Sequence, residues 1–278
     1  MHNAGYRALE LPFHYVPFRV RDLPGALAGM RALGIRGFGV SMPFKLEVMP
    51  LCDAVEPLAA RIGAVNTIVN DDGRLVGHNT DWSGAVAALA EALPLAGRRV
   101  LVLGAGGAAR AVAFGLADAR AEVVLANRSG DRARALGAEL GGLEVVDWAA
   151  RERTRCDAVV NASSLGMTDV DPASPLATLP APVVMDIVYK PIETELVRLA
   201  RRAGARVVHG GRMLLHQAAR QFELYTLRPA PLAAMERALD AALGAASPSP
   251  SRPGHRSKSW PPRAPRLSSG PPWQDPAR

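Results

Sequence analysis

Short strand patterns and one helix pattern occupy the first third of the chain. Residues 13–20 alternate between apolar and polar side chains and are rich in β formers, which predicts a strand. A helix is expected to begin after Asp22, which can cap it, and to end at about Leu33, because Gly34 follows. Three further strands are expected at 37–41, 64–70 and 74–78, the last two forming a hairpin around Asp71-Asp72-Gly73.

From residue 83 onward the pattern changes to an alternation of helices and strands. A helix of small apolar residues is expected from Ser83 to about Leu93. Apolar strand patterns, most of them separated by helical stretches, follow at 99–103, 122–126, 143–147, 156–161, 182–187 and 205–208. Strands joined by helices form parallel sheets with right-handed crossovers, so this part predicts a doubly wound domain. Two helical stretches, 212–226 and 231–244, are expected at the end.

The charge of the chain is unevenly distributed. Its 278 residues carry a formal net charge of +7, but +5 of this belongs to residues 247–278, which contain six basic residues and one aspartate. The rest of the chain is close to neutral, so we do not expect a basic groove for nucleic acid on it. Residues 247–278 also hold nine of the 23 prolines, and their Ser/Pro/Arg composition predicts a disordered tail.

Length and composition favour a soluble protein of two domains. The chain is 49% hydrophobic and 21% charged, and no apolar stretch approaches 18 residues, so we expect no contact with a membrane. Its first residues lack the pattern of a secretory signal, which predicts a cytoplasmic location. The two cysteines, Cys52 and Cys156, are far apart, and the six histidines do not cluster at ligand spacing. We therefore expect neither a disulfide framework nor a metal site.

Lysine is rare in this sequence, and its rarity draws attention to Lys45. The chain has 30 arginines and only three lysines, which are Lys45, Lys190 and Lys258. Lysine, unlike arginine, can lose its proton in a protein, so Lys45 is a candidate for chemistry. Polar side chains that accompany it at predicted strand ends and loops are Ser41, Asn66, Thr67, Asn79, Thr80 and Asp81. Lys45 beside Asp81 would form a proton-relay pair; the alternative is that both are surface residues.

A glycine-rich loop is the strongest motif in the sequence. Gly104-Ala105-Gly106-Gly107-Ala108-Ala109 follows the predicted strand 99–103 and opens a predicted helix, which is the context of a dinucleotide-binding G-x-G-x-x-A loop. Gly104 suits the tight turn, Gly106 allows the backbone to approach a pyrophosphate, and Ala109 allows close packing of helix on strand. The free N–H groups of the helix would face the phosphates. We therefore predict a bound dinucleotide.

The residues after the next strand favour NADP over NAD. An NAD site usually places Asp or Glu there, to bind the ribose 2′-hydroxyl. Here the uncharged Asn127 stands next to Arg128, and Arg132 lies one turn into the next helix, where both arginines could bind a 2′-phosphate. The alternative for Arg128 is a solvated loop residue.

Eight motifs in this order resemble those of the shikimate dehydrogenase family, over about residues 2–245. They are Ser41-Met42-Pro43-Phe44-Lys45, Gly63-Ala64-Val65-Asn66-Thr67, Asn79-Thr80-Asp81, Gly104-Ala105-Gly106-Gly107-Ala108-Ala109, Asn127-Arg128, Asn161-Ala162-Ser163-Ser164-Leu165-Gly166-Met167, Asp186-Ile187-Val188-Tyr189-Lys190-Pro191, and Gly210-x-x-Met213-Leu214-x-x-Gln217. The form Ser-Met-Pro-Phe-Lys, with Gln221-Phe222-Glu223-Leu224-Tyr225-Thr226 later, is most similar to the shikimate dehydrogenase-like subgroup.

This resemblance implies an activity and a set of site residues. Lys45 and Asp81 match the catalytic pair, which handles the proton while NADPH reduces the ketone of 3-dehydroshikimate, a step of aromatic amino acid biosynthesis. Residues that match substrate-contacting positions are Ser41, Asn66, Tyr189 and Gln217. Residues that match positions on the nicotinamide side are Ala162, Ser163, Met167, Gly210 and Met213.

The chain departs from the family pattern at its start and in its tail. Family members have a first strand and a Ser-x-Ser loop, which binds the substrate carboxylate, before His-Asn-Ala, whereas this chain begins Met1-His2-Asn3-Ala4. Either the start codon was assigned too late, or the protein lacks this strand and this clamp, which would expose a sheet edge and favour association. Family members also more often have Thr at the position of Ser41. The family pattern does not account for residues beyond 247.

These observations predict an α/β protein with a mixed-sheet substrate domain and a doubly wound Rossmann-type NADP domain. We expect the substrate domain over 1–82, completed by the helices of 212–245, the NADP domain over 83–211, and a monomer or homodimer with its site in the cleft between the domains. Three alternatives stay open: a quinate/shikimate-type dehydrogenase that uses NAD or another polyhydroxy cyclohexane carboxylate, a catalytically weak NADP-binding regulatory remnant, and a nucleic-acid-binding role.

Overall fold

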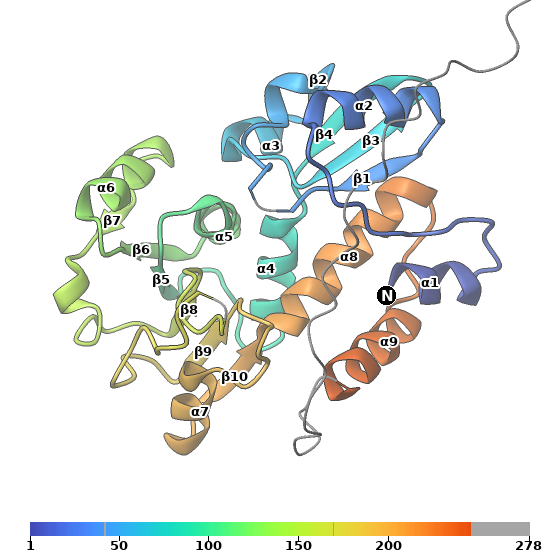
Figure 1. The fold of residues 1–278 in the computed structure, drawn as a ribbon. Helices are drawn as coiled ribbons and strands as arrows, with labels where there is room; N and C mark the ends of the chain where they lie inside the picture. The colour runs from blue at the N-terminus through green and yellow to red at the C-terminus, as the bar shows by residue number, and fades with distance from the viewer. Residues whose placement is uncertain (42, 169, 246–278) are drawn as a thin grey trace, which may run out of the picture.

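Two sheets organise the chain, and the smaller one belongs to its first third (Figure 1). The computed structural model describes residues 1–41, 43–168 and 170–245, so the predicted tail 247–278 lies outside the described residues. The smaller sheet has four strands in the order β1-β3-β4-β2, namely β1 (Gly37–Gly39), β3 (Thr67–Asp71), β4 (Arg74–His78) and β2 (Ala54–Val55). It is mixed, because β3 pairs antiparallel with β1 and β4, whereas β2 and β4 are parallel.

The β3–β4 hairpin and helix α2 form where the sequence predicts them. Asp72 and Gly73 both have positive φ in the turn between the two strands, as a tight hairpin requires. Asp22 caps α2 (Leu23–Ala32) by accepting a hydrogen bond from the N–H of Gly25 at 3.0 Å. Together with α3 (Pro57–Ile62) and a short 3₁₀ turn (Met49–Leu51), α2 covers one side of the sheet over an apolar core. Members of this core are Leu27, Met30, Val48, Ala59, Val65, Ile68 and Leu75.

The larger sheet has six parallel strands in the order β10-β9-β8-β5-β6-β7. Its strands are β5 (Arg99–Leu103), β6 (Glu122–Ala126), β7 (Glu144–Val145), β8 (Ala158–Asn161), β9 (Val183–Asp186) and β10 (Arg206–His209). The first strand in sequence, β5, lies in the middle of the sheet, and the chain changes direction between β5 and β8. This is the strand order of Rossmann folds, which bind ligands at the carboxyl ends of the strands on either side of that point.

The side chains of the central strands alternate between two apolar layers. On β5, Val100 and Val102 pack towards α4 (Asp81–Ala90) and α5 (Gly107–Asp118), whereas Leu101 and Leu103 pack in the opposite layer with α7 (Glu195–Arg202). Helix α6 (Gly130–Glu139) follows β6. Strands buried on both faces need apolar residues at every position, which explains their continuous apolar runs in the sequence.

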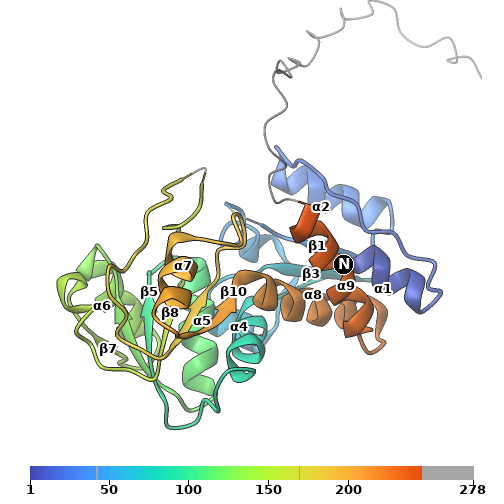
Figure 2. The same ribbon diagram turned by 90° about the horizontal axis from the view of Figure 1, so that it is seen from below.

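Helices α4 and α8 connect the two sheets. The chain leaves the first sheet through α4, completes the larger sheet, and returns through α8 (Gly210–Thr226). Figures 1 and 2 show both helices between the two sheets. They approach closely, because a Cβ atom at Gly84 of α4 would lie only 2.9 Å from the carbonyl oxygen of Met213 in α8. Helix α9 (Leu232–Ala245) then packs against α8 and against α1 (His2–Ala8) at the start of the chain.

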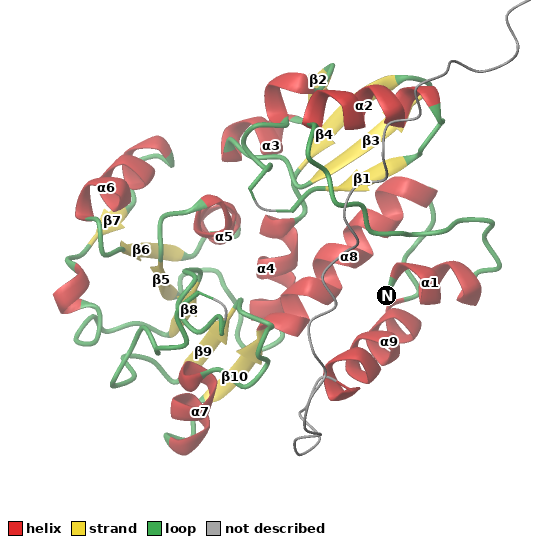
Figure 3. Cartoon of the chain, viewed as in Figure 1, coloured by secondary structure: helices red, strands yellow, loops and turns green. Residues whose placement is uncertain are grey.

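The strand predicted over 13–20 is wrong. Figure 3 shows that the chain between α1 and α2 is a loop, and no residue of 13–20 belongs to a ladder. Asn3 takes the place of a neighbouring strand at Tyr15, because its side chain accepts from the N–H of Tyr15 at 2.7 Å and donates to its carbonyl oxygen at 2.9 Å. Helix α1, strand β2 and helix α3 were not predicted. No helix among the described residues is long and apolar enough to span a bilayer.

Candidate active site

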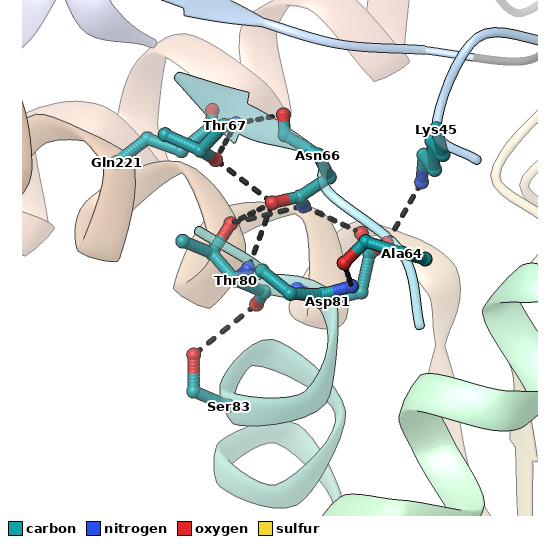
Figure 4. Close-up of polar contacts among 9 residues, drawn as sticks. Lys45, Ala64, Asn66, Thr67, Thr80, Asp81, Ser83 and Gln221 are labelled. Atoms are coloured by element: carbon teal, nitrogen blue, oxygen red, sulfur yellow. Dashed lines mark hydrogen bonds and ion pairs between the residues drawn. The ribbon is translucent and has the colours of Figure 1, made fainter. Parts of the chain in front are cut away.

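Lys45 and Asp81 form an ion pair between the loop after β1 and the start of α4. The Nζ atom of Lys45 lies 2.8 Å from Oδ2 of Asp81 (Figure 4). The carbonyl oxygen of Lys45 accepts a hydrogen bond from Val65 at 2.8 Å, which anchors the lysine to the segment before β3. The side chain of Asp81 is 2% exposed and that of Lys45 is 19% exposed, so a ligand can reach the ammonium group while the carboxylate stays covered.

Asn66 holds the second oxygen of Asp81. Its amide nitrogen donates to Oδ1 of Asp81 at 2.9 Å and to the hydroxyl of Thr80 at 3.1 Å. Its amide oxygen accepts from the N–H of Thr80 at 2.7 Å and from the hydroxyl of Thr67 at 2.8 Å. These two donors fix the orientation of the amide, so that its NH₂ group faces Asp81. Asn66 is completely buried, and it leaves Lys45 as the accessible member of the group.

Three further hydrogen bonds connect the end of the hairpin, the start of α4 and the segment before β3. Asn79 accepts from the N–H of Asp81 at 2.9 Å and donates to the carbonyl oxygen of Ala64 at 3.0 Å. The hydroxyl of Ser83 donates to the carbonyl oxygen of Thr80 at 3.1 Å. The first turn of α4 is therefore tied to the segment before β3, which keeps Asp81 at a fixed place.

Sequence reasoning missed a second row of residues behind Asn66. Gln221 of α8 donates to the hydroxyl of Thr67 at 2.9 Å, and the ring nitrogen Nε2 of His2 lies 3.4 Å from the amide oxygen of Gln221. His2 stacks on Tyr15 at a centroid distance of 4.3 Å, and burial lowers the pKa of its imidazole to about 4. The available signal was the spacing of Gln217 and Gln221, since residues four apart share one face of a helix.

The other residues predicted to bind substrate come from three separate segments. Ser41 is exposed after β1, Tyr189 is 40% exposed in the loop after β9, and Gln217 is half-buried on α8 beside Gly84 of α4. None of these three side chains makes a hydrogen bond within the described part of the chain. The structure therefore brings Lys45 and Asp81 together with Asn66 through direct contacts, but it joins none of these three side chains to them.

The glycine loop after β5 has the shape that a pyrophosphate requires. Gly104 has φ +122°, and a Cβ there would lie 2.9 Å from the carbonyl oxygen of Ala162, so only glycine fits. At Gly106 and Gly107, by contrast, a Cβ would meet no atom within 4 Å, which leaves open space at the start of α5. Ala109, in the first turn of α5, is fully buried. The remaining residues of the motif, Ala105 and Ala108, are half-buried.

Arg128 and Arg132 project from the segment after β6. Both are exposed, and neither forms an ion pair with another described residue. Asn127 bends the segment by donating to the carbonyl oxygen of Ser129 at 3.0 Å. The neighbouring Arg134, by contrast, is paired with Asp131 at 2.6 Å. Two unpaired guanidinium groups beside the glycine loop can receive a phosphate.

The residues predicted on the nicotinamide side lie around the ends of β8 and β9. Ala162 and Ser163 follow β8 directly, and the carbonyl group of Ala162 lies against Gly104. Gly210 begins α8, and a Cβ there would lie 2.5 Å from the carbonyl oxygens of Ile187 and Val188. Met213 is buried one turn further along α8, and Met167 is half-buried in the loop after β8. Within the described ranges, no group of three or more His, Cys, Asp or Glu residues is arranged to hold a metal ion.

Comparisons with known proteins agree with this geometry. Three family models match the chain: the shikimate dehydrogenase substrate binding domain over residues 1–68, shikimate / quinate 5-dehydrogenase over 87–165, and the shikimate 5′-dehydrogenase C-terminal domain over 210–239. A shikimate dehydrogenase (NADP(+)) of Moorella thermoacetica is 47% identical over 266 residues, which cover 90% of each chain. The chain belongs to the shikimate dehydrogenase family.

Solved structures extend the family match to the fold. The shikimate 5-dehydrogenase of Thermus thermophilus, crystallised with NADP(H) and shikimate, is 39% identical and has a TM-score of 0.80, covering 87% of this chain and 93% of its own. The quinate dehydrogenase of Corynebacterium glutamicum in complex with NAD is 32% identical, with a TM-score of 0.78, and covers 86% of this chain and 92% of its own. The predicted fold class of a mixed four-stranded sheet with a Rossmann-type parallel sheet is confirmed.

Proposed function

We propose that this member of the shikimate dehydrogenase family catalyses the reversible, NADP-dependent reduction of 3-dehydroshikimate to shikimate, a step of aromatic amino acid biosynthesis. The Lys45–Asp81–Asn66 group carries the proposal. It presents the partly exposed ammonium group of Lys45, held in place by the covered carboxylate of Asp81. Relatives named as NADP-dependent shikimate dehydrogenases, at 47% and 43% identity, support the choice of substrate and coenzyme. A cytoplasmic location is part of the same proposal.

Lys45 is the residue we assign to proton transfer. Its ammonium group donates a proton to the substrate oxygen as the ketone is reduced, and the neutral amine takes it back in the reverse direction. Asp81 keeps Lys45 in place, because its covered carboxylate is directed at the ammonium group. Asn66 keeps the Asp81 carboxylate turned towards Lys45. NADPH, when bound, supplies the hydride.

The coenzyme assignment follows from the shape and charge of the larger sheet's carboxyl edge. The open space at Gly106 and Gly107 and the free N–H groups at the start of α5 fit a pyrophosphate. We assign Arg128 and Arg132 to the 2′-phosphate, with Asn127 beside them. The nicotinamide side is assigned to Ala162, Ser163, Met167, Gly210 and Met213.

The substrate side and the domain division belong to the same proposal. Besides Asn66, we assign Ser41, Tyr189 and Gln217 to substrate contacts, and the absence of an internal partner for these three side chains among the described residues supports this. We assign residues 1–82 and the helices of 212–245 to the substrate domain, and 83–211 to the NADP domain. The site would lie between them, where α4 and α8 meet.

The first test measures the oxidation of shikimate and of quinate, each with NADP and with NAD. We expect turnover with shikimate and NADP. Turnover of quinate with NAD alone would instead select the quinate-type alternative, and coenzyme binding without turnover of any combination would select a regulatory remnant.

Two variants of Lys45 test its role. Lys45→Arg keeps the positive charge next to Asp81 but cannot give up its proton, whereas Lys45→Ala removes both. We expect kcat to fall at least ~100-fold in both variants, because general acid–base catalysis contributes about 10²–10⁴-fold. NADPH affinity should be unchanged, since Lys45 lies in the loop after β1 of the smaller sheet, whereas the coenzyme is assigned to the larger sheet. An active Lys45→Arg variant would assign Lys45 an electrostatic role only.

A further inference from the structure

Asp186 is a buried carboxylate that the proposed reaction does not use. It ends β9, and solvent does not reach it. Oδ1 accepts from the side-chain amide of Asn161 at 2.9 Å and from the N–H of Val188 at 3.0 Å, while Oδ2 accepts from the hydroxyl of Thr194 at 2.6 Å. No described lysine or arginine forms an ion pair with it. A buried carboxylate without a cation is costly, so its place in the fold calls for a function.

Asn161 connects this carboxylate to the loop after β8. Its amide nitrogen also donates to the carbonyl oxygen of Leu165 at 2.9 Å. Its amide oxygen accepts from the N–H of Ser163 at 3.1 Å and from the hydroxyl of Ser163 at 2.7 Å. The hydroxyl of Ser163 in turn accepts from the N–H of Leu165 at 3.2 Å. The loop that contains Ala162 and Ser163 is therefore folded around Asn161.

Oδ1 of Asp186, which accepts from Asn161, also fixes the loop after β9. Its bond to Val188 sets the direction of the backbone that leads to Tyr189, and Gly210 of α8 packs against the carbonyl oxygens of this loop. Strands β8 and β9 are adjacent and parallel, so both loops leave the same edge of the sheet. Ligands of Rossmann folds bind at that edge.

We propose that Asp186 is a positioning residue, whose carboxylate holds the loops after β8 and β9 in the arrangement that receives the nicotinamide half of NADP. This inference rests on the proposed function, because it concerns the same coenzyme. The adenine half, with its 2′-phosphate, is assigned to Arg128 and Arg132 after β6, to which Asp186 makes no hydrogen bond.

The hydrogen bonds explain how the carboxylate stays charged. Burial raises the pKa of Asp186 to about 6, and the bonds from Thr194, Val188 and Asn161 oppose this rise. Asp186 is therefore ionised at pH 7 and above, with three donors directed at it. Charged acceptors form stronger and shorter hydrogen bonds than neutral ones, so the ionised group holds the two loops more firmly than a neutral side chain would.

The experiment compares two ligands by calorimetry. NADPH occupies both halves of the coenzyme site, whereas adenosine 2′,5′-bisphosphate occupies only the adenine half. In Asp186→Ala we expect the Kd of NADPH to rise about tenfold, and kcat with shikimate to fall about 100-fold, because the ring is misplaced. The Kd of the bisphosphate should stay within about twofold, because its site lacks contacts with Asp186. Asp186→Asn keeps an acceptor for Asn161 and Val188 and should restore most of the NADPH affinity.

A general disturbance of the fold would change the Kd values of NADPH and of the bisphosphate together. If Asp186→Ala weakens both ligands equally, or weakens neither, Asp186 only supports the fold and the inference is wrong. If Asp186→Ala does not fold, the same two titrations on Asn161→Ala decide, because this variant cuts the link to the loop after β8 and leaves the Thr194 and Val188 bonds in place. Both titrations work without turnover, so their outcome is separate from the question of whether shikimate is the substrate.

Discussion

Gly84 sets the distance between α4 and α8. We therefore expect Gly84→Ala to disturb the geometry of the site, although Gly84 is not one of the residues assigned to it. The added Cβ would lie 2.9 Å from the carbonyl oxygen of Met213 and 3.0 Å from the backbone nitrogen of Gln217. These are backbone atoms, which cannot turn away as a side chain can. Ordinary contact begins at 3.4 Å, so α8 would have to retreat by about half an ångström.

The cost of this retreat follows from two opposing terms. Overpacking a well-packed contact costs about 1–3 kcal/mol. Replacing glycine with alanine inside a helix stabilises the folded state by about 1 kcal/mol. We therefore expect Gly84→Ala to lower the free energy of unfolding by about 1 kcal/mol. Its effect on kcat/KM should be larger, about tenfold, because Gln217 and Met213 move relative to Asp81 at the start of α4.

Gly29 of α2 provides the matched control. It lies in a helix interior like Gly84, but a Cβ there would meet no atom within 4 Å. Gly29→Ala should raise the free energy of unfolding by about 0.5–1 kcal/mol and leave kcat/KM unchanged. Denaturant unfolding and steady-state kinetics measure both quantities. If Gly84→Ala is as stable and as active as Gly29→Ala, the contact between α4 and α8 does not set the geometry of the site.

Two further predictions concern the coenzyme and the response to pH. Arg128→Ala should lower the ratio of kcat/KM for NADP to that for NAD by about 10- to 100-fold, since a charge-assisted hydrogen bond contributes about 1.5–3 kcal/mol. The same ratio should not change in Arg134→Ala, because Arg134 is already paired with Asp131. If the ratio is unchanged in both variants, Arg128 is a solvated loop residue that does not bind the 2′-phosphate. Burial lowers the pKa of His2 to about 4, below its value in the unfolded chain, so its contribution to stability is complete above about pH 6.5 and is lost as the pH falls to about 4. Relative to His2→Gln, the wild type should therefore lose up to ~3 kcal/mol of unfolding free energy between about pH 6.5 and pH 4, as measured by urea unfolding. Asp186 is present in both proteins, so its own titration cancels in the difference. A difference that does not change with pH would contradict the burial of His2 as a neutral ring.

The parallel sheet could be predicted closely from the sequence, because burial on both faces leaves a clear pattern. Strands β5 and β6 have the bounds that the apolar runs at 99–103 and 122–126 predict. Strand β7 is shorter than the run at 143–147, with only Glu144 and Val145 in the ladder. It is an edge strand and pairs with β6 alone.

The segment 13–20 shows where such patterns fail. Its aromatic β formers pack on rings of other elements, as Phe13 does on Tyr6 of α1 at 5.5 Å and Phe18 on Phe38 of β1 at 6.2 Å. An alternation of apolar and polar residues serves this packing as well as it serves a strand. The deciding feature is the hydrogen-bond partner, and here the side chain of Asn3 supplies it. The pattern alone does not contain that information.

The site could be predicted in part. The rarity of lysine and the polar residues at strand ends drew attention to Lys45 and Asp81, and the structure places them 2.8 Å apart. The contact between Gln221 and Thr67 could not be predicted, because the two residues are 154 positions apart in the sequence and meet only when α8 packs beside β3. Local patterns do not determine contacts of that range.

The return of the chain through α8 has a consequence for synthesis on the ribosome. Gly37 of β1 packs against Tyr225 near the end of α8, and α1 packs against α9. The helices that complete the packing of the four-stranded sheet and of α1 are therefore made only after every strand of the larger sheet has been translated. The larger sheet and the residues assigned to NADP are complete once Met213 has emerged, whereas the four-stranded sheet, although made first, must wait for the end of α8 with one side uncovered. If translation is arrested at successive chain lengths, the nascent chain should therefore bind NADP before its four-stranded sheet becomes resistant to protease.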